Sequence, residues 1–186
     1  MKIMGKKVLK RTKFLEFVQT NYINMNNKLA QWVWVRRPGN QKAVVIAALH
    51  ENGKLVVIEE YRVPIEGYEL GFPAGLIDDG EDPAEAVRRE LLEETGLKLE
   101  EVIMISPAVI SSAGLSNESV HLAYVKVSGE PNKDKLEASE DITTYLMDQD
   151  DVKHAMFGGI PDKFSSYSIG KFAYSVMRNF VEHGTI

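Results

Sequence analysis

The segment from Asp82 to Gly96 limits most strongly what this chain can fold into, because it carries start and stop signals for one helix. Asp82 suits the N-cap, Pro83 occupies the first helical position, and Gly96 favours the left-handed conformation that ends a helix. Val87 and Leu91 form an apolar stripe at helical spacing. The sequence therefore predicts an amphipathic helix in this segment.

Three glutamates share one face of the predicted helix. Glu90, Glu93 and Glu94 stand at positions i, i+3 and i+4, so their carboxylates lie within one turn of each other. Like charges at this spacing repel by roughly a few tenths of a kcal/mol per exposed pair, and a divalent cation would reverse that repulsion. The alternative is a solvated helix face, on which Arg88 and Arg89 pair with neighbouring acids.

Composition restricts a metal at this face to a hard cation with oxygen ligands. The chain has no cysteine, which excludes disulfides, thiolate zinc sites and cysteine nucleophiles, and its four histidines form no metal-spaced pair. Carboxylate, phosphate and water oxygens together suit Mg²⁺, with Mn²⁺ as an alternative. We therefore predict Mg²⁺ as the cofactor.

Strand and helix signals surround the glutamate helix without a regular βαβ alternation. A hairpin is predicted from Ala43–Leu49 and Leu55–Tyr61, joined through Glu51-Asn52-Gly53, and residues 67–80 look loop-rich. The remaining expected elements are three strands and a closing helix, at Val102–Ile105, Val120–Val127, Ile142–Met147 and Ile169–Val181. We expect a mixed sheet packed between helices.

The N-terminal part is β-rich. A strand through Trp32-Val33-Trp34-Val35 would place both tryptophans on one face. The basic residues before it suit the solvated side of early strands, and a phosphate-facing role is the alternative. We divide the chain into a β-rich N-terminal extension, residues 1–42, and a main domain, residues 43–186.

Charge and hydropathy limit the partners. The net charge of −5 argues against binding to nucleic acid or to an anionic membrane. The N-terminus lacks the apolar region of a signal peptide, and no apolar run is long enough to span a bilayer. We therefore predict a cytoplasmic protein without nucleic-acid or membrane partners.

The residues around the glutamate helix complete a longer pattern. It reads glycine, five residues, glutamate, seven residues, then Arg-Glu-aliphatic-x-Glu-Glu-x-Gly-aliphatic, and it is matched by Gly75, Glu81, Arg89-Glu90-Leu91, Glu93-Glu94 and Gly96-Leu97. This segment resembles the Nudix box at every fixed position. The resemblance implies an α/β (α+β) fold, the Nudix-type α/β/α sandwich with a mixed sheet, and hydrolysis of a nucleoside diphosphate linked to a second group.

The same resemblance implies roles for the residues of the box. Glu90, Glu93 and Glu94 would be catalytic as ligands of the divalent metal, with the backbone carbonyl of Ala74 as a further ligand. Arg89 and Glu81 would orient the helix and the loop before it.

The flanking residues are similar to the ADP-ribose pyrophosphatase (ADP-sugar diphosphatase) branch of that family. They are Glu60–Pro64, Phe72–Glu81, Ser111–Glu118 and Glu137–Ile142. The chain departs from the branch at Ala113, where a proline is usual, and at Gly71, where a glutamate is usual. The branch implies ADP-ribose as substrate, AMP and ribose 5-phosphate as products, and a homodimer in which residues 1–42 serve dimerisation.

Substrate contacts are expected outside the box. Arg62 is a candidate for gripping the diphosphate, and a surface ion pair is its alternative. Trp32 and Trp34 are candidates for stacking an adenine, unless they are core or interface residues. Glu69, which lies two residues before Gly71, and Gly114 complete the expected substrate-binding set.

A general base is expected in a loop after the box. The branch places this acid where the chain has Glu140, and Glu118 and Glu137 are the alternatives. Each of the three is otherwise a solvated loop acid.

Other functions stay open at this stage. One is a Nudix hydrolase of a GDP- or UDP-hexose or of a dinucleoside polyphosphate. Another is a nucleotide-sensing module without catalysis, which the complete set of box acids disfavours. The sequence assigns no role to residues 158–168.

Overall fold

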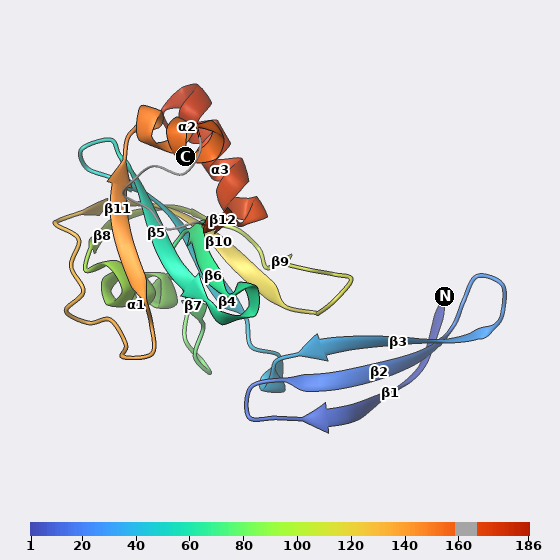
Figure 1. The fold of residues 1–186 in the computed structure, drawn as a ribbon. Coiled ribbons are helices and arrows are strands. Elements are labelled where there is room, and N and C mark those ends of the chain that lie inside the picture. The colour runs from blue at the N-terminus through green and yellow to red at the C-terminus, as the bar shows by residue number, and fades with distance from the viewer. Residues whose placement is uncertain (159–166) are drawn as a thin grey trace. The chain divides into compact units, whose positions relative to one another are not determined.

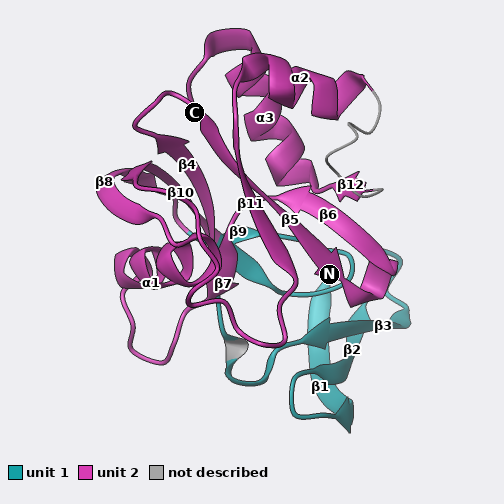
Figure 2. Ribbon diagram, turned by 60° about the vertical axis from the view of Figure 1, so that its left-hand side comes forward, with its two compact units in different colours: residues 1–43, 108–120 teal, residues 44–107, 121–186 magenta. Residues whose placement is uncertain are grey.

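The computed structural model describes residues 1–158 and 167–186, and the chain forms two compact units (Figures 1 and 2). The first unit comprises residues 1–43 and 108–120, and the second comprises residues 44–107 and 121–186. Most of the unassigned stretch 158–168, namely residues 159–166, lies outside the described residues.

The first unit is built on an antiparallel sheet with the order β1-β2-β3. Its strands are β1 (Lys2–Arg11), β2 (Glu16–Ile23) and β3 (Leu29–Arg36), followed by the short 3₁₀ helix η1 (Pro38–Asn40). Residues 108–120 add β9 (Val109–Ile110), which pairs with the start of β10 (Ser119–Ser128). The tryptophans of β3 line one pocket, so they share a face as the strand alternation predicts.

The second unit contains a larger mixed sheet. Its main path runs β12-β6-β5-β4-β10-β8, while β11 pairs with β5 and β7 pairs with β4. Strand β12 is parallel to β6, whereas β5 is antiparallel to β4, β6 and β11. The strand bounds, with the 3₁₀ helix η2, are β4 (Ala43–His50), β5 (Leu55–Arg62), η2 (Val63–Ile65), β6 (Gly67–Gly71), β7 (Ala74–Leu76), β8 (Lys98–Ile105), β11 (Ile142–Met147) and β12 (Tyr167–Ile169).

Helices cover both faces of this sheet (Figure 2). Because side chains alternate along a strand, β4 and β5 contribute residues to two separate hydrophobic cores, one on each face of the sheet. Val44, Ile46, Ala48 and Val56 pack with α1 (Pro83–Thr95), whereas Ala47, Leu55 and Val57 pack with α2 (Gln149–Phe157) and α3 (Lys171–His183). The second unit is therefore the mixed α/β/α sandwich that the sequence predicts.

The predicted start and end of the box helix are confirmed. The Asp82 side chain accepts a hydrogen bond from the Ala84 amide at 2.8 Å, and Pro83 begins α1. Gly96 ends the helix at a φ of 72°, and a Cβ there would overlap the Asn132 side chain. The predicted hairpin is also confirmed as β4 and β5.

Two regions differ from the sequence-based expectation. Residues 67–80 contain β6 and β7, whose short length and flanking glycines hide them, and pairing with β5 and β4 supplies their hydrogen-bond partners. Helix α2 is not predicted from the sequence, because the helix buries only Val152 and Ala155 and so lacks an apolar stripe. Its start is marked only by the capping box of Asp148 and Asp151. Among the described residues, no helix combines the length and apolar character needed to cross a membrane.

Candidate active site

Arg89 joins α1 to the loop that precedes it. Its guanidinium donates to both carboxylate oxygens of Glu81, at 3.0 and 2.9 Å, and to the Leu76 carbonyl at 2.9 Å. Glu81 also accepts from the Asp78 backbone amide at 2.9 Å, and the bond from Arg89 holds the pKa of Glu81 below its ordinary value. These contacts fix the loop against the helix, as the resemblance implies for Arg89 and Glu81.

Arg89 also reaches two of the three box glutamates. Its Nη1 donates to Glu90 Oε1 at 2.7 Å and to Glu93 Oε2 at 3.3 Å. The carboxylate of Glu90 lies directly against Gly75, where any added Cβ would overlap it. A side chain at this position of the box would therefore displace the Glu90 carboxylate, which lies close to the backbone of β7.

Glu94 is the most buried of the three box glutamates, with 5% of its surface exposed. Its Oε2 accepts a hydrogen bond from the Ala74 amide at 3.0 Å. Burial raises the pKa of Glu94 to about 9. The hydrogen bond from Ala74 lowers this pKa, whereas the negative charges of Glu60, Glu90 and Glu140 raise it further. A cation at this point would oppose the same repulsion and favour the ionised carboxylate.

The loop between β10 and β11 brings Glu140 to the box glutamates. Repulsion from Glu140 contributes to the raised pKa of both Glu90 and Glu94, after the larger effect of burial. The pKa of Glu140 is itself raised, first by burial and then by the charges of Glu137 and Glu93. Its Oε2 accepts from the Glu137 amide at 3.2 Å, which ties the side chain to its own loop.

Arg62, at the end of β5, lies between two carboxylates. Its Nη1 lies 2.6 Å from Glu60 Oε1, and its Nε lies 3.1 Å from Glu69 Oε2. The second oxygen of Glu69 lies against Gly170 at the start of α3. Although Arg62 is ion-paired, 42% of its side chain is exposed, so it is also accessible to a ligand.

The donor set around α1 fits a hard divalent cation. Its oxygens belong to mutually repelling carboxylates, and Glu94 is buried among them with a raised pKa. As the side chains stand, however, the described residues contain no preassembled group of three acidic or histidine ligands. Each of the three carboxylates has one oxygen in a hydrogen bond, Glu90 and Glu93 with Arg89 and Glu94 with the Ala74 amide.

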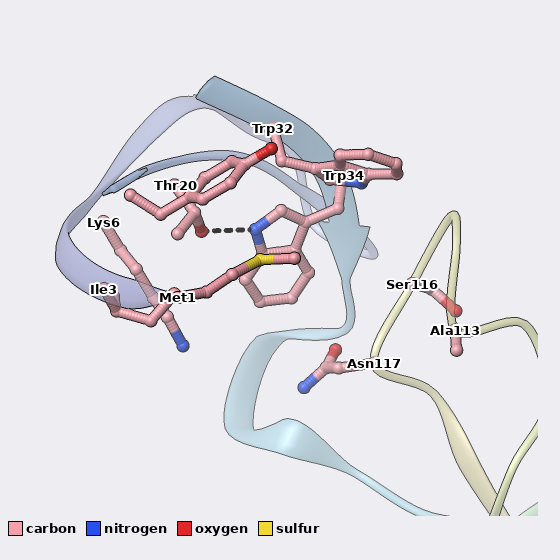
Figure 3. A pocket seen from close by; sticks show the side chains of 10 residues that line it. Met1, Ile3, Lys6, Thr20, Trp32, Trp34, Ala113, Ser116 and Asn117 are labelled. Atoms are coloured by element: carbon pink, nitrogen blue, oxygen red, sulfur yellow. Dashed lines mark hydrogen bonds between the residues drawn. The ribbon is translucent and has the colours of Figure 1, made fainter. Parts of the chain in front are cut away.

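The first unit contains a separate pocket of about 480 Å³, lined in part by the two tryptophans (Figure 3). Trp34 Nε1 donates to Thr20 Oγ1 at 2.8 Å, and Trp32 Nε1 donates to the Gly114 carbonyl at 3.2 Å. Lys6 Nζ lies 5.3 Å from the Trp34 ring centroid, a cation–π contact. Flat aromatic walls with polar groups beside them suit a planar ring. The lining residues are Met1, Ile3, Lys6, Thr20, Tyr22, Trp32, Trp34, Ala113, Ser116 and Asn117.

Two residues near these sites are not singled out by the sequence pattern. Lys6 belongs to the basic residues that the sequence pattern assigns to a solvated strand face. Its place beside the pocket depends on the pairing of β1 with β2, where it lies opposite Thr20, and a local sequence pattern does not indicate this pairing. Glu60 has a place in the family resemblance but no role of its own there. The alternation of β5 after the buried Val56 and Ile58 is the signal that places it on the α1 side of the sheet.

Comparison with known proteins now decides the family. Residues 39–166 match the family model described as the NUDIX domain. The chain belongs to the Nudix family. The loop–helix–loop around Arg89 is its Nudix box, and the chain is a Nudix hydrolase, a class that generally depends on divalent metal.

Two curated relatives support the predicted branch. The chain is 34% identical over 137 residues to the ADP-sugar pyrophosphatase of Mus musculus, in an alignment that covers 69% of this chain and 62% of the mouse protein. The match thus spans less than two thirds of that relative's length. It is 29% identical over 147 residues to the ADP-ribose pyrophosphatase of Bacillus subtilis, with 77% of each chain covered.

A solved structure supports the fold. The crystal structure of an ADP compounds hydrolase superposes with a TM-score of 0.72, covering 97% of this chain and 93% of that one at 21% identity. At this identity the likeness concerns the fold alone, and it agrees with the mixed α/β/α arrangement described above.

Proposed function

We propose that this Nudix hydrolase cleaves a nucleoside diphosphate linked to a second group, in a Mg²⁺-dependent reaction with ADP-ribose as the preferred substrate. The observation that carries the proposal is the burial of Glu94 among further carboxylates on the box side of the sheet. The names of the mouse and Bacillus relatives support ADP-sugars as the substrate class.

Glu90, Glu93, Glu94 and the Ala74 carbonyl are the proposed ligands of the cation, which is Mg²⁺ or, as an alternative, Mn²⁺. When bound, the cation neutralises charge on the phosphates and lowers the pKa of a nearby water. Arg89 acts indirectly, because its bonds to Glu81 and Leu76 hold the helix against β7, which carries Ala74, and the loop after it.

Glu140 is the proposed general base. Its carboxylate takes a proton from the attacking water, whose oxygen bonds to a phosphorus as the bridging P–O bond of the diphosphate breaks. One ADP-ribose and one water thus yield AMP and ribose 5-phosphate. The direction of its pKa shift, upward through burial and neighbouring charge, supports proton acceptance by Glu140. Glu137, in the same loop, and Glu118, in the first unit, are the alternatives.

Arg62 is proposed to bind the diphosphate, because its exposed guanidinium can form paired bonds to phosphate oxygens. Glu69 is proposed to assist by holding Arg62 from the opposite side. Within the first unit, the pocket of Trp32 and Trp34 beside Gly114 is the proposed base-binding site. Residues 1–42 are the proposed dimerisation extension of a homodimer.

A second candidate function follows from two departures from the branch pattern. Gly71 and Ala113 stand where glutamate and proline are usual, so the preferred substrate is alternatively a GDP- or UDP-hexose or a dinucleoside polyphosphate. A nucleotide-sensing module without catalysis is a third alternative.

A substrate panel tests these alternatives. The full chain is incubated with ADP-ribose, GDP-mannose, UDP-glucose or a diadenosine polyphosphate, with Mg²⁺ or EDTA, and the products are resolved by chromatography. We expect AMP and ribose 5-phosphate from ADP-ribose at the highest kcat/KM, and none in EDTA. A faster reaction with another substrate overturns the ADP-ribose assignment, and no reaction with any of them overturns hydrolysis.

A further inference from the structure

Glu60 of β5 lies outside the Nudix box but faces the same side of the sheet. Alternation along β5 places it on the face of Val56, which packs against α1. Only 14% of its side chain is exposed. A carboxylate with so little contact to water requires a compensating charge or a function.

The strands on either side of Glu60 connect it to two parts of the site. In β11, Ile142 is its cross-strand partner, and Ile142 lies two residues after Glu140. The Tyr61 amide donates to the Asp141 carbonyl at 3.1 Å, which fastens the end of this loop beside Glu60. Glu60 therefore lies where the loop of the proposed base joins the sheet.

On its other side, Glu60 is paired with a second acid. Its cross-strand partner in β6 is Glu69, and like charges directly opposite each other destabilise a sheet. Arg62 lies between the two carboxylates, with Nη1 2.6 Å from Glu60 Oε1 and Nε 3.1 Å from Glu69 Oε2, so one positive charge is paired with two negative charges. The trio keeps a net negative charge, and within it Glu60 is the more buried acid.

The remaining neighbour is Glu94. Thr144 of β11 donates to the Glu94 carbonyl at 3.5 Å, and its cross-strand partner is Ile58, which lies two residues before Glu60 on the same face of β5. The negative charge of Glu60 therefore acts on Glu94 from the adjoining strand. A buried carboxylate and a partly buried one that repel each other destabilise the protein without metal, and the arrangement becomes favourable once a cation lies beside them.

We propose that Glu60 is a positioning residue of the metal site, whose carboxylate strengthens binding of the divalent cation at Glu94 and holds Arg62 toward the diphosphate. This inference rests on the proposed function of the box glutamates. It extends the metal site to a strand residue that the box does not contain.

The test compares Glu60→Gln with Glu69→Gln in the full chain. Both variants remove one carboxylate from Arg62, but only Glu60 lies on β5, the strand that pairs with β11, whose Thr144 contacts Glu94. Binding of Mn²⁺ alone, without substrate, is measured by isothermal titration calorimetry after circular dichroism has verified the fold. We expect Glu60→Gln to weaken Mn²⁺ binding about tenfold or more, and Glu69→Gln to change it by less than about twofold. Both should raise KM for the substrate, because both loosen Arg62.

Glu60→Asp provides a variant that keeps the charge. We expect it to retain the Mn²⁺ affinity within about threefold, an outcome that a purely structural role for the glutamate side chain does not explain. Unchanged Mn²⁺ binding in Glu60→Gln overturns the role of Glu60 alone, and so does an equal loss in Glu69→Gln. Absence of Mn²⁺ binding by the unmodified chain overturns the proposed function itself, and the inference with it.

Discussion

Replacing Glu94 by glutamine is expected to stabilise the metal-free protein while it abolishes hydrolysis. Glu94 has 5% of its surface exposed, and burial is the main reason that its pKa rises from the ordinary value of 4.5 to about 9. Glutamine has nearly the same size and can still accept the hydrogen bond of the Ala74 amide. It carries no charge, so it ends the repulsion with Glu60, Glu90 and Glu140 but also removes a metal ligand.

The magnitude follows from the difference in pKa between the folded and unfolded states. Folded Glu94 holds its proton more tightly than the unfolded chain does. This tighter proton binding contributes to the free energy of unfolding. The contribution is fully present below the ordinary pKa of 4.5 and is lost as the pH rises through about 9. At about pH 8 the loss is at most ~5 kcal/mol, from ~1.36 kcal/mol for each pH unit. Relaxation and water entry around the charge reduce this, so we expect Glu94→Gln to gain ~1–3 kcal/mol.

Urea unfolding in EDTA measures this gain, at about pH 6 and again at about pH 8. The gain should be larger at the higher pH, since more of the wild-type stability has been lost there. Glu93→Gln is the matched control, because 41% of the Glu93 side chain is exposed, and its free energy of unfolding should change by less than ~0.5 kcal/mol. In Mg²⁺ the wild-type chain should instead be more stable than Glu94→Gln, because the cation stabilises only a chain that binds it. A loss of stability in Glu94→Gln in EDTA, or a gain that does not grow with pH, refutes this reasoning.

Three further changes address other parts of the site. Glu140→Gln should lower kcat at least about 100-fold and leave Mn²⁺ affinity within a few-fold, measured by initial rates and calorimetry, and near-normal turnover excludes Glu140 as the base. Gly75→Ala should lower kcat at least about tenfold because its Cβ overlaps the Glu90 carboxylate. Gly5→Ala, with open space around its Cβ and no left-handed φ, serves as the control, and equal kcat in the two variants contradicts the close approach. Gly96→Ala should lower the free energy of unfolding by at least about 1 kcal/mol in urea, because its φ of 72° and the Asn132 side chain both disfavour a Cβ; an unchanged value contradicts this.

The parts of the fold that the sequence predicts are those encoded by neighbouring residues. Asp82, Pro83 and Gly96 mark the ends of α1 within one short segment, and Gly53 marks the hairpin turn with its φ of 79°. The parallel pairing of β12 with β6 is different, because its partners are far apart in the sequence and its strand is three residues long. The association of residues 108–120 with the first unit is likewise a tertiary property without a local signal.

The same distinction holds for the site. Helical spacing alone places Glu90, Glu93 and Glu94 on one face, because all three belong to a single helix whose ends the sequence marks. The approach of Glu140 to this face depends on how β11 pairs with β5, so only the family resemblance points to it. The bridge of Arg62 between Glu60 and Glu69 depends on the register of β5 and β6, which neither residue pattern nor resemblance indicates.

The most direct test of the account follows the phosphorus atoms of ADP-ribose by ³¹P nuclear magnetic resonance during incubation with the full chain. In Mg²⁺, we predict that the diphosphate signals disappear and that two phosphomonoester signals, from AMP and ribose 5-phosphate, grow in equal amounts. In EDTA, and with Glu94→Gln in Mg²⁺, the diphosphate signals should persist. Cleavage that continues in EDTA, or a diphosphate that survives with the unmodified chain in Mg²⁺, would contradict a metal-dependent hydrolase built on the box glutamates.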